Sequence, residues 1–328
     1  MKIAIVNAIR PSSGSGSGIT EYAYQLITHL KPLLSKQDTL DEIYAINESR
    51  YNNIRGLILA NTTFKCRLAQ ISKSKFDIIH ITDHELGFAA KILKKSGTTA
   101  KIITTIHDLS RFEGTLHKGI AQKTYNKLVR GSIRDAILYS DLLLCNSTQT
   151  YYTIRKRFPQ VKNIIIVPHG IDDSFFTVKK ETKKNNEEKF IIGYLGSLAY
   201  HKNVIFLLHA ADILKYNSEY EFQIYGTGTE SQHLKQFKEK HHLNNVLLMG
   251  IAQQRNKVKI YDTFDVFVFP SLYEGLGYPI LEAQQRKIPV VIRKESHITK
   301  EVRGYCLQSK TPEQLANLLK NFQIPCVK

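Results

Sequence analysis

The sequence predicts an α/β protein made of two doubly wound domains, each with a parallel sheet covered by helices on both faces. Short runs rich in Ile, Val and Leu alternate with longer amphipathic stretches, which is typical of parallel sheets whose crossovers are helices. A polar segment, KKETKKNNEEK at 179–189, interrupts this pattern, and the pattern then starts again. A length of 328 residues also suits two domains better than one.

The first domain is expected to span residues 1–178. Its apolar runs predict five strands, and amphipathic stretches separate several of them. The expected elements are strand 2–6, helix 18–35, strand 77–81, helix 85–96, strand 101–106, helix 118–139, strand 142–147, helix 147–158 and strand 163–168. Residues 179–189 cannot build a core and are expected to form a surface linker.

The second domain is expected to span residues 190–328. Its predicted strands are 190–196, 221–226, 245–250, 265–271 and 289–292. Two such domains leave a cleft between them, and doubly wound sheets bind ligands at the carboxyl ends of their strands. Residues that directly follow a strand are therefore the first candidates for a functional site.

Composition narrows the classes of protein. The net charge is +17, and residues 1–180 hold 26 Lys/Arg against 14 Asp/Glu, so most of the excess lies in the first half. This charge could attract an anionic membrane, a phosphorylated substrate or nucleic acid, or it could serve only to keep the protein soluble. Nucleic acid is the least favoured, because no motif of interleaved aromatic and basic residues stands out.

The expected location is the cytoplasm. The four cysteines are far apart and form no CxxC pair, which indicates neither a disulfide framework nor a zinc site. No run reaches the ~18 to 20 apolar residues of a membrane span. The apolar start of the chain precedes a Gly/Ser loop and is interpreted as a first strand, not as a signal peptide.

The stretch YEGLGYPILEA at 273–283 follows an apolar strand and precedes a helix. A glycine-bearing turn at a helix N-terminus presents backbone N–H groups and the positive end of the helix dipole, which suits phosphate. Pro279 fits the first helical turn, where its missing N–H costs nothing. The N–H groups of Leu276, Gly277 and Tyr278 are the expected phosphate donors.

Two carboxylates, Glu274 and Glu282, flank this turn. They would repel phosphate, so we expect them to face hydroxyl groups instead, because a carboxylate accepts hydrogen bonds from a vicinal diol. Glu282 would then hold ribose hydroxyls and Glu274 would hold sugar hydroxyls on the other side of a diphosphate. The ligand that fits is a nucleotide-diphosphate sugar. The alternative is a capped helix with a structural Glu and a surface Glu.

The stretch GSLAYHKN at 196–203 follows the first strand of the second domain. Lys202 is expected to lie over the same diphosphate and to neutralise the leaving group, with help from His201. Gly226, at the end of strand 221–226, and Ser197 complete the candidate donor contacts. The alternative for Lys202 is a surface lysine at the start of a helix.

The first domain offers three groups of candidates. Gly16 and Gly18 lie in a Gly/Ser loop with the order G-x-G-x-G. This order, with no clear acidic residue ~20 positions further on, matches a dinucleotide-binding fingerprint poorly. The two glycines would instead allow the backbone to approach the diphosphate or the acceptor closely. His107 ends strand 101–106 and is a catalytic candidate. Asp83 and His84 end strand 77–81, where they either shape an acceptor pocket or cap the next helix.

Together, FVFPSLYEGLGYPILEA, LGSLAYHKN, TIHDL and VPHGID resemble glycosyltransferase family 4, whose members are retaining, metal-independent enzymes of GT-B architecture. The resemblance runs from residue 1 to about residue 310. It implies that the first domain binds the acceptor and the second the nucleotide sugar, without a metal cofactor. It also implies residue roles: Glu274 faces the donor sugar, Gly277 and Tyr278 contact sugar and phosphate, Glu282 binds ribose, Lys202 binds the diphosphate, His107 lies near the transferred sugar, and Gly18 matches the second glycine of the first loop.

The chain departs from the family pattern at Ser197 and His201, where arginine is frequent, so less positive charge would face the diphosphate. A weakly catalytic sugar-nucleotide or glycan-binding protein therefore remains an alternative, as does, less favoured, an NAD(P)-dependent oxidoreductase. The GSLAYHKN stretch favours mannosyltransferase-like relatives and hence GDP-mannose as donor.

Stretch 118–137 carries Lys123, Lys127, Arg130 and Arg134 at spacings of 4, 3 and 4, which places them on one face of a helix. Such a face can rest on an anionic membrane. The hypothesis is a peripheral enzyme with a lipid-linked or membrane-proximal acceptor; the alternative is a solvated face.

Overall fold

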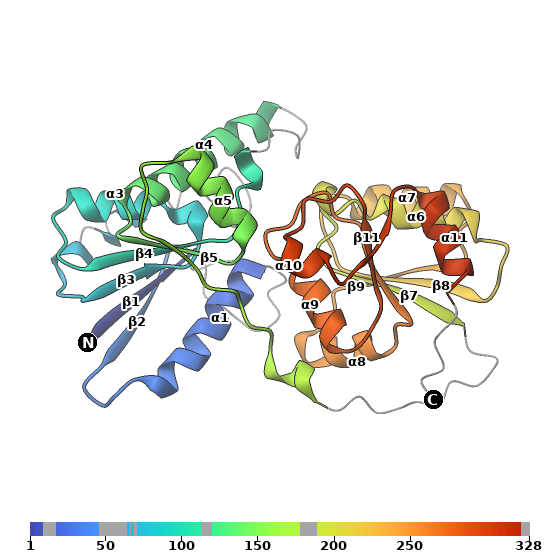
Figure 1. The fold of residues 1–328 in the computed structure, drawn as a ribbon, viewed down its shortest axis with the longest axis horizontal. Coiled ribbons are helices and arrows are strands. Elements are labelled where there is room, and N and C mark those ends of the chain that lie inside the picture. The colour runs from blue at the N-terminus through green and yellow to red at the C-terminus, as the bar shows by residue number, and fades with distance from the viewer. Residues whose placement is uncertain are drawn as a thin grey trace. The chain divides into compact units, whose positions relative to one another are not determined.

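The computed structural model describes residues 1–8, 18–45, 64–65, 67–68, 71–112, 120–177 and 189–322. The chain divides into two compact units, Met1–Gly170 and Ile171–Lys328, which are coloured from blue to red along the chain in Figure 1. The division falls ahead of the expected linker, and residues 178–188 of that region lie outside the described residues.

The first unit is a parallel sheet in the order β2-β1-β3-β4-β5-β6. The chain leaves β1 for β2 on one side and continues from β3 on the other, so the switch point lies between β1 and β3. Helices α3, α4 and α5 lie on one face of the sheet and α1 on the other (Figure 1). The elements are β1 (Lys2–Asn7), α1 (Gly18–Leu30), β2 (Thr39–Tyr44), β3 (Ile78–Ile81), the 3-10 helix η2 (His84–Leu86), α3 (Phe88–Lys95), β4 (Lys101–Ile106), α4 (Ile120–Tyr139), β5 (Leu142–Cys145), α5 (Thr148–Arg157) and β6 (Ile164–Ile166).

Alternation along β1 explains how this sheet is covered on both faces. Ile3 and Ile5 pack with Ile27 of α1 in one small core. Ala4 and Val6 point to the opposite face and belong to the larger core of this unit, because successive strand side chains alternate between faces. This two-sided burial produces the apolar runs from which the strands were predicted.

The second unit is a parallel sheet in the order β12-β11-β10-β7-β8-β9. The chain moves outward from β7 to β9 and returns to β10 on the other side of β7, so the switch point lies between β7 and β10. Helices α6, α7 and α11 cover one face and α8 and α9 the other (Figure 1). The elements are the 3-10 helix η4 (Asp173–Phe176), β7 (Phe190–Leu195), the 3-10 helix η5 (Tyr200–Lys202), α6 (Ile205–Ile213), β8 (Tyr220–Tyr225), α7 (Ser231–Lys240), β9 (Val246–Gly250), α8 (Lys257–Asp262), β10 (Val266–Phe269), α9 (Tyr278–Gln285), β11 (Val290–Arg293), α10 (Lys300–Arg303), β12 (Leu307–Ser309) and α11 (Pro312–Lys320).

The predicted fold class is confirmed, and among the described residues two strands were not predicted. Strands β2 and β12 are both at the edge of their sheets. The sequence of β2, TLDEIY, is half charged or polar, and β12 has only three residues. Neither carries the apolar run that marks a strand covered on both faces.

Candidate functional site

The glycine turn before α9 has the geometry that the sequence predicted. Gly277 is the N-cap residue, with a left-handed backbone at φ 87° and ψ 58°, a conformation that glycine adopts far more readily than other residues. Tyr278 is the first residue of α9 and Pro279 the second. The N-terminus of α9 therefore lies where the sequence placed the phosphate site.

Lys202 and Glu274, the predicted diphosphate lysine and sugar-facing acid, form an ion pair. The Lys202 Nζ lies 2.6 Å from Oε1 of Glu274, and the two side chains are only 16% and 11% exposed. Lys202 ends η5 after β7, and Glu274 lies in the loop after β10, so the two come from the strands that flank the switch point. Each of these side chains neutralises the charge of the other.

Further contacts hold these two loops together. The Leu272 N–H donates to the His201 carbonyl at 2.8 Å, and the Asn203 side-chain amide donates to the Pro270 carbonyl at 3.3 Å. Asn203 adopts a left-handed backbone at φ 53°, which asparagine tolerates better than most residues. The backbone thus fixes the position from which Lys202 reaches Glu274.

Glu282 is buried one turn inside α9. Its Oε1 accepts a hydrogen bond from Lys257 Nζ, and its Oε2 accepts one from the Tyr261 hydroxyl at 2.8 Å. Burial, and then the charge of Glu282, raise the pKa of Tyr261 well above its usual range, so Tyr261 remains a hydrogen-bond donor. A buried carboxylate needs such partners.

The sequence did not single out Lys257 or Tyr261. They lie four residues apart on α8 and so share one helix face. That spacing is a weak signal by itself, because the partner, Glu282, is far along the chain.

Ser197 and Gly226 have structural roles here. The Ser197 carbonyl accepts a hydrogen bond from the Tyr194 hydroxyl at 2.8 Å. A Cβ on Gly226 would lie 1.8 Å from the Gly196 carbonyl oxygen. The end of β8 can therefore approach the loop after β7 only because residue 226 is glycine. Donor contacts for Ser197, His201 and Gly226 stay predictions.

His107 lies in a buried cluster of aromatic rings in the first unit. Its Nε2–H donates to the Thr82 carbonyl at 2.8 Å, which leaves Nδ1 without a proton in the neutral ring. Burial, followed by the nearby His169 and His84, lowers the pKa of His107 well below its usual range. The rings of His107 and His169 are 5.1 Å apart, and Tyr22 stacks on His169 at 4.1 Å.

His84 and Asp83 lie beside this cluster. The Nδ1 of His84 accepts a hydrogen bond from the His107 backbone N–H at 3.3 Å, so the structure brings these two predicted residues together. Asp83 is the N-cap residue of η2, and its carboxylate accepts from the Glu85 N–H at 2.8 Å. The capping alternative describes what Asp83 does here, and an acceptor role stays a prediction.

The remaining candidates of the first unit are only partly described. Gly18 is the first residue of α1. Gly16 and the side chain of Lys123 lie outside the described residues. Lys127 and Arg134 are exposed on α4, whereas the guanidinium of Arg130 donates to the Arg111 carbonyl.

Two leucines accompany the exposed basic residues of α4. Leu128 and Leu138 are 46% and 39% exposed. Leu138 shares the helix face of Lys127 and Arg134, whereas Leu128 lies about 100° around the helix from Lys127. In the part of the chain that the structure describes, every helix is too short or too polar to cross a bilayer.

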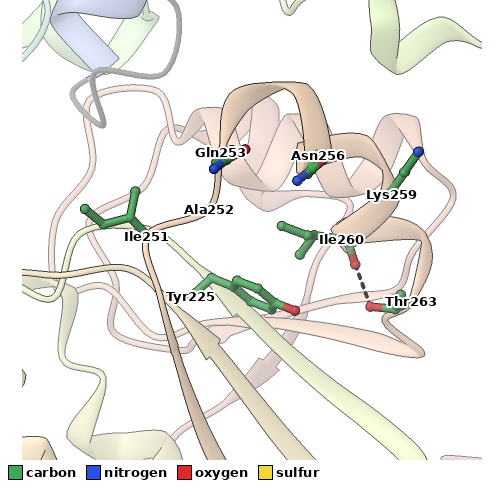
Figure 2. Close-up of a pocket in the computed structure, with 8 residues that line it drawn as sticks. All are labelled: Tyr225, Ile251, Ala252, Gln253, Asn256, Lys259, Ile260 and Thr263. Atoms are coloured by element: carbon green, nitrogen blue, oxygen red, sulfur yellow. Dashed lines mark hydrogen bonds between the residues drawn. The ribbon is translucent and has the colours of Figure 1, made fainter.

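A cavity of about 460 Å³ lies at the carboxyl ends of β8 and β9 in the second unit. Figure 2 shows Tyr225 of β8 below it and Asn256 and Lys259 at its upper rim. Its wall uses a different face of α8 from the one that carries Lys257 and Tyr261. No sequence motif pointed to this cavity.

The two doubly wound sheets, with charged side chains grouped after the central strands of the second, define a two-domain α/β protein of GT-B architecture. A model of the family described as "Glycosyltransferase Family 4" matches residues 18–175. A second model, described as "Glycosyl transferases group 1", matches residues 175–323. The chain belongs to glycosyltransferase family 4, as the sequence motifs predicted.

Among curated proteins, the chain is 25% identical over 233 residues to the UDP-Gal:alpha-D-GlcNAc-diphosphoundecaprenol alpha-1,3-galactosyltransferase of Escherichia coli. The aligned region is 68% of this chain and 59% of the relative, so the chain spans less than two thirds of that protein's length.

Solved structures share the fold. Anabaena Alr3699/HepE, in complex with UDP and glucose, is 15% identical with a TM-score of 0.70, covering 98% of this chain and 89% of that one. WaaG, a glycosyltransferase involved in lipopolysaccharide biosynthesis, is 14% identical with a TM-score of 0.74, covering 97% and 90%.

Proposed function

We propose that this protein transfers a sugar from a nucleotide-diphosphate sugar to a glycan or lipid-linked acceptor, with retention at the anomeric carbon and without a metal ion. The observation that carries the proposal is the Lys202–Glu274 ion pair at the switch point of the second unit. Glu274 lies three residues before Gly277, the N-cap residue of α9. Membership of the family supports it.

Donor binding would break this ion pair, because Lys202 and Glu274 would each bind a different part of the ligand. The diphosphate offers Lys202 a stronger anionic partner, so the ammonium moves onto the phosphates and stabilises the leaving group. Glu274 then accepts hydrogen bonds from sugar hydroxyls. The N–H groups at the start of α9 add to the phosphate site, and Glu282 holds the ribose.

The retaining step is proposed from the family resemblance. The acceptor attacks on the face from which the phosphate departs, and that phosphate takes the acceptor proton. The enzyme supplies no nucleophile in this scheme. His107 is neutral and offers an unprotonated Nδ1 to the transferred sugar.

The donor and acceptor classes draw support from relatives. The Escherichia coli relative is named for a UDP-galactose donor and a diphosphoundecaprenol-linked acceptor, and the HepE structure holds UDP and glucose. We therefore propose a lipid-linked or glycan acceptor and place UDP-sugars beside GDP-mannose among the donors to test.

Thermal unfolding with UDP-, GDP- and ADP-sugars tests donor binding. One of the three should raise the melting temperature. Glu282→Ala should weaken the binding of that ligand by about 2 kcal/mol or more, because it removes a buried charged contact. Glu295→Ala, at an exposed position, is the matched control. A stabilising nucleotide that Glu282→Ala leaves unaffected would contradict the ribose role.

Activity is tested with the donor identified in this way. The anomeric configuration of the product, read by NMR, reports retention or inversion, and transfer in excess EDTA reports metal dependence. An inverted product, or activity that EDTA abolishes, would contradict the corresponding part of the proposal.

A sugar-nucleotide-binding protein with little catalysis is the second candidate. Ser197 and His201 stand where arginine is frequent, so Lys202 and the helix N-terminus would meet the diphosphate with less help. Donor binding without hydrolysis or transfer across the donor panel would favour this candidate. NAD(P) is included in the same thermal screen, where stabilisation by it alone would favour an oxidoreductase.

We also propose that α4 rests on an anionic membrane. Lys127 and Arg134 supply charge, Leu138 supplies apolar contact on the same exposed face, and Leu128 adds apolar contact beside it. Flotation should recover more protein with anionic than with neutral liposomes, and Lys127→Glu with Arg134→Glu should abolish the difference. Equal recovery of the unchanged protein would contradict the idea.

A further inference from the structure

We propose that Lys257 is the second half of the ribose site: Glu282 accepts hydrogen bonds from the ribose hydroxyls, while Lys257 donates a hydrogen bond to a ribose oxygen. The inference rests on the proposed function, because it assumes a nucleotide donor at Glu282. It names the ligand class more narrowly, as a ribonucleoside diphosphate in preference to its 2′-deoxy counterpart.

The carboxylate of Glu282 is held by two side chains of one helix. Lys257 bonds to one carboxylate oxygen and Tyr261 to the other. A carboxylate offers about four acceptor positions, so about half remain for a ligand. Because each oxygen is already anchored, the carboxylate plane is fixed before a ligand arrives, which reduces the entropy that binding must remove.

The ammonium of Lys257 also keeps donor capacity. It has three N–H groups, of which one bonds to Glu282. The ring of Phe175 lies 5.8 Å from Nζ and covers one side of the ammonium. The side chain of Lys257 is 16% exposed, against 6% for Glu282, so solvent and ligand reach the lysine more easily than the acid.

The paired charges match the chemistry of a vicinal diol. Each hydroxyl both donates and accepts, whereas a carboxylate alone only accepts. Lys257 and Glu282 place a donor and an acceptor side by side. A site of this kind loses affinity for an analogue that lacks one hydroxyl, because a polar group of the protein is then left without its partner.

Calorimetric titration of the full chain tests this assignment. The probes are UDP, GDP and ADP and their 2′-deoxy counterparts, and the variants are Lys257→Met and Lys259→Met. Methionine keeps the apolar stem of lysine without its charge. Lys259 is on the same helix but lines the cavity of Figure 2, so Lys259→Met is the matched control.

The unchanged protein should bind one ribonucleotide at least ~10-fold more tightly than its deoxy counterpart. Lys257→Met should lose most of that ratio by weakening the ribonucleotide more than the deoxy form, and Lys259→Met should keep it. If Lys257→Met weakens both forms equally, Lys257 only neutralises Glu282 and the inference is wrong. Unchanged binding would also overturn it.

A second comparison covers the case in which Lys257→Met does not fold because it leaves a buried charge unpaired. Glu282→Gln is compared with the double variant Lys257→Met/Glu282→Gln, which carries neither charge. A further loss of ribonucleotide preference in the double variant supports the inference, and no further loss overturns it. If the unchanged protein binds none of the six probes, the proposed function is wrong as well. If it binds one of them, the comparison tests only the role of Lys257.

Discussion

The carboxyl group of Asp83 is buried, and the folded protein disfavours its charged form. Burial, and then the neighbouring Glu85, raise the pKa of Asp83 from 3.8 to about 6. Because the folded pKa is above the unfolded one, Asp83 contributes stability that is complete below about pH 4 and is lost as the pH rises through about 6. At neutral pH the charged form opposes folding.

Asp83→Asn should therefore stabilise the protein at pH 8. Asparagine keeps an oxygen to accept from the Glu85 N–H but has no charge to desolvate. The gain should approach about 3 kcal/mol at pH 8, at about 1.4 kcal/mol per pKa unit, and should vanish near pH 4. Urea unfolding between these pH values measures it. The exposed Asp41→Asn is the control, and a gain that does not change with pH would contradict the assignment.

At the residue scale, motifs predicted the acids and the lysine but not the contacts between them. Glu274 and Lys202 were identified because each follows an apolar strand. Their ion pair joins residues 72 positions apart, and the one between Glu282 and Lys257 joins residues 25 apart. No local pattern specifies such pairs: the first depends on β7 and β10 being neighbours in the sheet, and the second joins the helices α8 and α9.

At the element scale, the loop that carries Lys202 depends on one glycine at the end of β8. Gly226 has φ +144°, and a Cβ there would lie 1.8 Å from the Gly196 carbonyl oxygen. Gly250 ends the neighbouring strand β9 with φ +71°, yet open space surrounds its Cβ position. The two glycines share a positive φ and differ in whether a methyl group fits.

Gly226→Ala should destabilise the protein by about 3 kcal/mol or more, because backbone must shift to make room. Gly250→Ala should cost about 1 to 2 kcal/mol, from its backbone conformation alone. Gly226→Ala should also weaken donor binding, since it displaces the loop before Lys202. Urea unfolding and nucleotide titration of both variants measure these effects, and equal stability losses would show that the close contact is unimportant.

Strand prediction succeeded where both faces of the sheet are covered. The residues of β10, VFVF, are all buried, and such runs are legible in the sequence because every position must be apolar. The edge strand β2 exposes Thr39 and Asp41, so its alternation is too polar to separate it from a loop. Pairing with β1 defines it as a strand, and pairing is not a local property of sequence.

At the scale of the whole molecule, the second unit begins at Ile171, before the charged segment 179–189 that was predicted to be the linker. Phe175 is 1% exposed in the core of this unit, with its ring 5.7 Å from that of Tyr261. Arg286, also buried, donates to the Phe175 carbonyl at 3.1 Å and pairs with Asp262 at 2.8 Å. A polar run is easy to see in a sequence, whereas the burial of one phenylalanine is not.

Two adjacent phenylalanines test this placement. Phe175→Ala should cost about 3 to 5 kcal/mol of unfolding free energy, as for other buried phenylalanines, while Phe176→Ala should cost little because its side chain is 60% exposed.

A fragment that starts at Ile171 should accordingly be more stable than one that starts at Phe190, which lacks Phe175 and the carbonyl that Arg286 holds. Thermal unfolding of both fragments decides the matter: equal melting temperatures would mean that residues 171–177 only connect the two units, and Phe175 would then have no part in the core that supports Tyr261 and Glu282.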